Sequence, residues 1–193
     1  MKIFLRFYLL FVLTASISFA QTVRVDQTVQ GDEMNYLIDS PDTFYVGTTM
    51  GVFRSPDKGQ SWNVVTENSI NYSVRAMQMQ ERKLFVGTNG GGIYISSNAG
   101  QTWLAMNNGL LNKNILSVGN GSTFVLVGTT HGGIYILDNG VNDWKNANDG
   151  IPPQADVYTV SAVGGMLYAG TQVGIFSSPV GKIKWSLVEE KLR

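Results

Sequence analysis

The feature that most constrains the fold of this chain is a repeat of 41 residues. Three columns share this spacing: Trp62, Trp103, Trp144 and Trp185; Gly51, Gly92, Gly133 and Gly174; and Phe53, Tyr94, Tyr135 and Phe176. Self-similarity with a period of about 20 to 50 residues is the signature of a repeat architecture. The sequence therefore predicts four copies of one small structural unit.

Each copy has the pattern of four short strands. In the second copy, segments 73–78, 83–88, 92–96 and 102–106 are rich in β-branched or aromatic residues and are bounded by Gly, Asn or Ser. Such runs between turn residues are typical of strands joined by tight turns. A helical repeat would need apolar residues three and four apart over long segments, and this pattern is missing. The sequence predicts an all-β fold, a β-propeller of four-stranded antiparallel blades.

The repeat places the blades at about residues 34–68, 73–109, 115–150 and 156–190 of one domain over 21–193. Four blades is the low end of the propeller range of about 4 to 8. Residues 22–25 fall in the phase of a fourth strand without its first three. They either add an edge strand to the last blade or belong to a blade whose other three strands this chain lacks. A closed four-bladed ring, an open arc completed by oligomerisation and a part of a larger propeller therefore all stay open.

The turn between the third and fourth strands carries the motif Ser-x-Asp/Asn-x-Gly-x-Ser/Thr-Trp. Asp and Asn side chains accept hydrogen bonds from backbone N–H groups just ahead, and Gly supplies a positive φ. The later copies lose the polar turn residues but keep the tryptophan, which indicates a structural role. A surface turn contributes about 1 kcal/mol, whereas a buried Trp contributes about 3 to 5. The motif residues are Ser55, Asp57, Gly59, Trp62, Ser96, Asn98, Gly100, Trp103, Trp144 and Trp185.

This motif, with the run Phe-Val-Gly-Thr-x-x-Gly-Gly-Ile-Tyr before it, resembles the Asp-box, or bacterial neuraminidase repeat, of the WD40/YVTN/BNR-like propellers. The resemblance extends from about residue 34 to the end of the chain. It implies blade structure and says little about function. Asp-boxes occur alike in sialidases, xyloglucan-degrading enzymes, sortilin-type receptors and photosystem assembly factors.

No catalytic residue is predicted. The resemblance to sialidases implies an arginine cluster, but the arginines that follow the leader are scattered over different strand phases. Xyloglucan hydrolysis requires two carboxylates about 5 to 9.5 Å apart across a cleft. Asp32, Glu33, Asp39, Asp149 and Asp156 qualify only in being acidic and near connecting loops. The alternative reading is a fragment or degenerate relative of a propeller glycoside hydrolase.

Composition limits the kinds of cross-link, metal site and partner that this chain can have. The chain has no Cys, so disulfides and thiolate metal sites are excluded. Lys+Arg and Asp+Glu each number 14, and loss of Lys2 and Arg6 with a leader leaves 12 against 14, a net charge of −2. A nucleic-acid partner is therefore disfavoured. No metal and no cofactor are predicted.

Residues 1–20 have the pattern of a secretory signal peptide. Basic Lys2 and Arg6 precede an apolar stretch over 7–17, and Ser18 and Ala20 stand at positions −3 and −1 before Gln21. The stretch is shorter than the roughly 20 residues of a membrane span, although an uncleaved anchor is the alternative. We expect a periplasmic or secreted protein with no membrane span after cleavage.

A binding site is predicted on the face formed by the turns between second and third strands and by the links between blades. Loops on a rigid scaffold commonly carry function. Their amide, hydroxyl and aromatic groups suit a peptide backbone or a glycan, although the same residues are good turn formers. The predicted function is a non-catalytic module for protein interaction or glycan binding. The candidate residues are Thr49, Tyr72, Asn89, Asn114, Thr130, His131, Asp156 and Gln172.

Overall fold

The computed structural model describes residues 33–66 and 69–190, which form four antiparallel sheets of four strands each. The predicted signal peptide and the strand at 22–25 lie outside the described residues. Blades 1 and 2 contain β1 (Met34–Ser40), β2 (Thr43–Thr48), β3 (Gly51–Ser55), β4 (Asn63–Val64), β5 (Val74–Gln80), β6 (Lys83–Thr88), β7 (Gly92–Ser96) and β8 (Leu104–Ala105). Blades 3 and 4 contain β9 (Ile115–Asn120), β10 (Phe124–Thr129), β11 (Gly133–Asp138), β12 (Lys145–Asn146), β13 (Val157–Val163), β14 (Met166–Thr171), β15 (Gly174–Pro179) and β16 (Ser186–Glu190).

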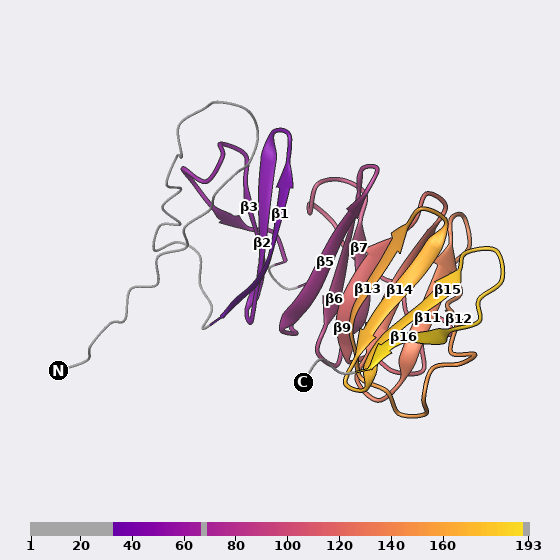
Figure 1. Cartoon of the computed structure of the whole chain (residues 1–193). Coiled ribbons are helices and arrows are strands. Elements are labelled where there is room, and N and C mark those ends of the chain that lie inside the picture. The colour runs from indigo at the N-terminus through magenta and orange to yellow at the C-terminus, as the bar shows by residue number, and fades with distance from the viewer. Residues whose placement is uncertain (1–32, 67–68, 191–193) are drawn as a thin grey trace.

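The blades follow one another through space in chain order. The first strands of consecutive blades pack side by side, β1 with β5, β5 with β9 and β9 with β13. Figure 1 shows blade 1 at the left, blade 2 beside it, and blades 3 and 4 overlapping at the right. The prediction of an all-β propeller built from four-stranded antiparallel blades is confirmed.

A threonine closes the turn between the second and third strands in every blade. Its hydroxyl donates to the carbonyl of the glycine that begins the third strand. This turn is one residue longer in blades 2 and 3 than in blades 1 and 4, so the first two strands depart from the 41-residue spacing. The pairs are Thr48 with Gly51, Thr88 with Gly92, Thr129 with Gly133 and Thr171 with Gly174.

The fourth strands of blades 1 to 3 are shorter than the sequence predicts, with two residues each. One further backbone bond follows each of these strands, and side chains then replace the ladder. Asn107 Oδ1 accepts from Ile93 N at 2.9 Å, and Asn148 accepts from Ile134 N in the same way. An amide that bonds to backbone offers the chain an alternative to strand pairing. The fourth strand of blade 4 has five residues, Ser186–Glu190.

The turn motif of blade 1 has the hydrogen bonds that its residue types predict. Asp57 Oδ1 accepts from Ser61 N and from Ser55 Oγ, both at 2.8 Å, and Gly59 has a φ of 92°. The hydrogen bonds from the Ser61 side chain, the Ser61 backbone and Ser55 lower the pKa of Asp57 to about 2. In blade 2, Asn98 makes the matching bond to Thr102 N at 2.9 Å.

The lowered pKa of Asp57 predicts a loss of stability in acid. The folded pKa lies below the unfolded one, so this stabilisation is present above about pH 4 and is lost as pH falls through about 2. Asp57→Asn should remove this loss and keep the fold at neutral pH, because Asn98 serves blade 2 at the same place. Thermal melts of both proteins from pH 5 to pH 2 measure the difference. An identical loss in the variant would assign the acid sensitivity to other carboxyls.

Each blade has a forward face, turned toward the next blade in chain order, and a backward face, turned toward the previous one. The forward-face residues Tyr45 and Val52 of blade 1 pack with Leu84 and Val86 on the backward face of blade 2. The same arrangement recurs twice. Phe85 and Ile93 pack with Val125, Val127 and Tyr135, and Leu126 and Ile134 pack with Leu167, Ala169 and Phe176. The core of the protein is this series of layers between blades.

The tryptophans tie neighbouring blades together. Trp103 Nε1 donates to Val65 O at 2.7 Å, so the indole of blade 2 bonds to the backbone of blade 1. Trp144 and Trp185 make the same bond to Met106 O and Ala147 O, at 2.8 and 2.7 Å. A buried indole N–H that finds a partner removes the cost of burying a polar group. Each interface therefore includes an indole hydrogen bond inside an apolar layer.

A glycine on the second strand leaves room for the next blade. A Cβ on Gly47 would lie 2.5 Å from Cγ1 of Val74, and a Cβ on Gly87 would lie 2.5 Å from Cγ2 of Ile115. At Gly128 the same atom would lie 2.5 Å from the carbonyl oxygen of Val157. We call this position the glycine notch. It allows the first strand of the next blade to approach closely.

Candidate functional site

The structure places the predicted binding residues at one end of the blades. Thr49, Asn89, Thr130 and Gln172 each follow the threonine that ends the second strand. Asn114 and Asp156 stand directly before the first strands of blades 3 and 4. We call this end, with the links between blades, the loop face.

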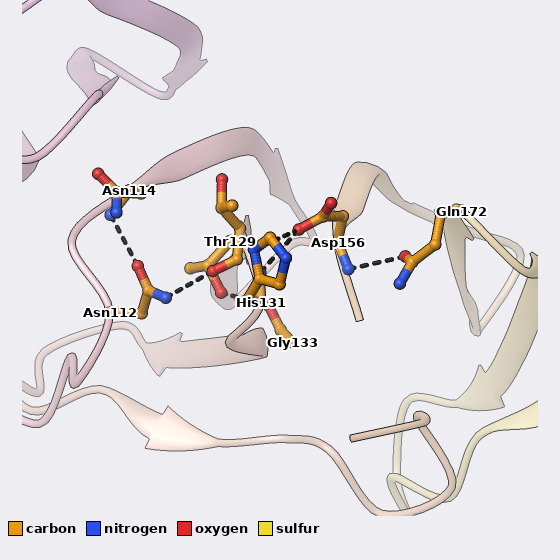
Figure 2. Close-up of polar contacts among 8 residues, drawn as sticks. Asn112, Asn114, Thr129, His131, Gly133, Asp156 and Gln172 are labelled. Carbon is orange, nitrogen blue, oxygen red and sulfur yellow. Dashed lines mark hydrogen bonds and ion pairs between the residues drawn. The ribbon is translucent and has the colours of Figure 1, made fainter. Parts of the chain in front are cut away.

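One polar cluster of the loop face joins blades 3 and 4 (Figure 2). Asp156 Oδ1 accepts from the backbone N of His131 at 2.8 Å and lies 3.2 Å from its Nδ1. Gln172 Oε1 accepts from the backbone N of Asp156 at 2.7 Å. His131 has a φ of 54°, a conformation uncommon for a residue with a side chain, and Asp156 holds it there.

A second polar cluster joins blades 2 and 3. Thr130 N donates to Asn114 O at 3.0 Å, and Asn112 Nδ2 donates to Thr130 O. Asn112 Oδ1 also accepts from Asn114 N at 2.9 Å, a contact visible in Figure 2. Asn89 forms an isolated β-bridge with Asn114. Sequence reasoning did not single out Asn112, although Asn before a strand is a typical local acceptor.

The two remaining candidates lie toward blade 1. Thr49 N donates to Glu33 O at 3.3 Å. The ring of Tyr72 lies against the glycine turn of blade 2, where a Cβ on Gly90 would be 3.8 Å from its Cδ1. Burial raises the pKa of Tyr94, and Tyr72 adds to this shift, so the two phenols are neighbours. Tyr72 stays 43% exposed.

Large apolar side chains stand among these polar clusters. Leu111 in the link between blades 2 and 3 is 87% exposed, while its neighbour Leu110 is buried. Met50 and Val173, in the turns of blades 1 and 4, are exposed as well. Sequence reasoning did not single out Leu111, because a Leu–Leu pair in a link does not reveal which side chain enters the core. The loop face therefore presents apolar groups around hydrogen-bonded polar ones.

The described residues hold no group of three or more His, Cys, Asp or Glu that could bind a metal. The same residues include no helix that is long and apolar enough to cross a membrane. A pocket of about 290 Å³ lies at the opposite end of blades 1 and 2 and includes Glu81 and Arg82. Its lining contains a single carboxylate, whereas glycoside hydrolysis generally uses two.

No family model and no curated protein sequence matches this chain. Solved structures do resemble it. The extracellular domain of the hybrid two-component system BT4673 from B. thetaiotaomicron has a TM-score of 0.71 at 16% identity, over 86% of this chain and 24% of that one. An ancestral GH74 enzyme has a TM-score of 0.66 at 17% identity, over 82% and 26%.

YCF48 bound to a D1 peptide also has a TM-score of 0.66, at 12% identity, over 86% of this chain and 56% of that one. The chain thus spans between about a quarter and just over half of the length of these structures. Likeness at this level of identity shows the fold alone. With the four antiparallel sheets, it shows that the described residues form four blades of a β-propeller fold.

Proposed function

We propose that this protein is a non-catalytic propeller module that binds a protein partner through its loop face. The observation that carries the proposal is the exposed apolar set on that face, Leu111, Met50 and Tyr72, around polar clusters already bonded internally. Aromatic residues and Met are enriched in protein interfaces. Such groups would supply apolar contacts at the centre of an interface, and exposed amides such as Asn89 would supply its rim.

The internal bonding of the polar clusters favours a protein over a glycan. Binding a glycan would require free side-chain donors and acceptors. The carboxylate of Asp156 and the side-chain carbonyls of Asn112 and Gln172 already accept bonds from the protein backbone. A structural neighbour of the same fold, YCF48, is bound to a peptide. This likeness supports the proposal by analogy of fold only.

A catalytic role is the second candidate, since one neighbour is a GH74 enzyme. Assays on xyloglucan and on aryl sialosides test it with the purified protein. Turnover above a heat-treated control would overturn the non-catalytic proposal.

We also propose that the protein is exported and that its repeats are Asp-box repeats. Residues 1–20 act as the signal peptide, the domain covers 21–193, and the protein works in the periplasm or outside the cell. The motif at Ser55, Asp57 and Gly59, with its internal hydrogen bonds, supports the Asp-box assignment. N-terminal sequencing of the protein from its native cells should read Gln21, and an intact Met1 contradicts the export proposal.

The loop-face proposal predicts a selective loss of binding. Leu111→Asp should abolish capture of partner proteins from an envelope extract, because it puts a charge at the centre of the proposed interface. Leu104→Asp is the matched control, since Leu104 is 64% exposed on β8, away from the loop face. Quantitative mass spectrometry compares the captured proteins. If the two variants lose the same proteins or neither loses any, the loop face is not the binding site.

A further inference from the structure

The forward face of blade 4 matches the forward faces that are buried elsewhere in the chain. Tyr168 pairs across its sheet with Ser161, at the place of Tyr45 and Phe85 in blades 1 and 2. Tyr45 and Phe85 are each 3% exposed, whereas Tyr168 is 39% exposed. Ile175, at the place of the fully buried Ile134, is 41% exposed. Blade 4 therefore displays an interface surface that no described blade covers.

Two further features of this face match the interfaces inside the chain. Gly170 occupies the glycine notch, and among the described residues its Cβ would meet only Cγ2 of Thr159 in the same blade, at 2.7 Å. The carbonyl of Val188 stands 41 residues after that of Ala147, which accepts the indole N–H of Trp185. The face thus has a notch that no other described blade fills and a carbonyl at the position of a tryptophan acceptor.

The backward face of blade 1 carries the complementary groups. Met34 pairs with Thr48 as Val74 pairs with Thr88, so it holds the position that fills a notch, and it is 46% exposed. Trp62 Nε1 donates to Gly59 O of its own turn at 3.2 Å, where the other three indoles donate to the preceding blade. Blade 1 therefore carries a side chain at the position that fills a notch, Met34, and an indole N–H that does not bond to another described blade, Trp62.

We propose that two copies of this chain pair head to tail, with the forward face of blade 4 in each copy packed on the backward face of blade 1 in the other. Met34 enters the notch at Gly170, and Trp62 Nε1 donates to the carbonyl of Val188. The two equal interfaces close a ring of eight blades, within the propeller range of about 4 to 8. The forward-face residues of the first three strands of blade 4 are uncharged, and on β16 the charged residue Glu189 pairs with Ile175. The residues of the first three strands are Thr159, Ser161, Val163, Tyr168, Ile175 and Ser177.

The occupant is a second copy because one chain carries both halves of an interface that it already forms three times. Two exposed ends that are unlike and complementary give a head-to-tail contact, which produces a ring when the rotation closes. Among the described residues, Val46, Phe53 and Trp62 of blade 1 form a buried cluster with other residues of blade 1. The proposal is independent of the loop face and its partner.

Sedimentation of the purified chain at micromolar to 100-micromolar concentration tests the pairing. The wild type should be a dimer. Ile175→Asp on blade 4 and Met34→Asp on blade 1 should each raise the dimer dissociation constant by about 100-fold or more, because each buries a charge in an apolar interface. Both side chains are exposed in the single chain, so each variant should fold, and circular-dichroism melts check this. Leu104→Asp should remain a dimer.

Mixing the two variants gives the sharpest result. An equimolar mixture of Ile175→Asp and Met34→Asp restores one unaltered interface, so dimers should reappear although each variant alone is monomeric. A monomeric wild type overturns the proposal. So does a Met34→Asp variant that stays dimeric while Ile175→Asp dissociates, since that result assigns the contact to two like blade 4 faces. Failure of the mixture to form dimers also contradicts it.

Discussion

Replacement of Trp144 by alanine is expected to lower the free energy of unfolding by about 3 to 5 kcal/mol. Trp144 is 2% exposed and packs in the layer between blades 2 and 3. Its loss leaves a cavity in that layer and removes the bond from Nε1 to Met106 O. Chemical denaturation followed by circular dichroism measures the change. An effect of this size is a large part of the total stability of an average domain, about 5 to 15 kcal/mol.

Trp144→Phe separates the two contributions of this side chain. Phenylalanine keeps most of the apolar volume and loses the indole N–H, so we expect a smaller loss, about 1 to 2 kcal/mol. Leu104→Ala, at an exposed position on β8, controls for the general effect of truncation and should change stability little. A loss at Trp144→Ala no larger than that of the Leu104 control would contradict the role of the tryptophan as an interface pillar.

The elements that the sequence predicted are those whose cause is local. A Thr and a Gly flank each hairpin, and Asp57 stands ahead of Gly59; both are short-range patterns with one favoured geometry. The tryptophan every 41 residues indicates that this local unit is repeated. The prediction of four-stranded blades could therefore be made from spacing and turn chemistry. The same reasoning placed the loop residues at one end of the blades, since strand order determines which turns share an edge.

The parts that could not be predicted depend on contacts between segments. The lengths of the fourth strands follow from Asn107 and Asn148, whose side chains bond to the third strand in place of the backbone. The contact of His131 with Asp156 joins residues 25 apart in the sequence. Nothing in the pattern distinguishes the buried Leu110 from the exposed Leu111. Tyr168 and Phe85 hold the same position in their blades, and the sequence does not show which of the two faces another blade covers.

Replacement of Gly128 by alanine is the second change with a large expected effect. The new Cβ would lie 2.5 Å from the carbonyl oxygen of Val157 and would also meet Ser117, which donates its hydroxyl to that same oxygen. Two of these atoms belong to the first strands of blades 3 and 4, so the blades must move apart to make room. Overpacking of this kind costs about 1 to 3 kcal/mol, and loss of the Ser117 bond adds about 1. Denaturant unfolding measures the sum.

Gly170→Ala is the matched control, since Gly170 holds the same notch in blade 4 and has only Thr159 beside it. Both substitutions are best compared in the Ile175→Asp background, where a second copy cannot occupy the notch. We expect Gly128→Ala to destabilise more than Gly170→Ala, because the Cβ at 128 would meet the backbone of the next blade, whereas the Cβ at 170 would meet only the side chain of Thr159, at 2.7 Å. Equal losses would mean that the cost is one of alanine in a strand, and the glycine notch would then have no role in blade packing.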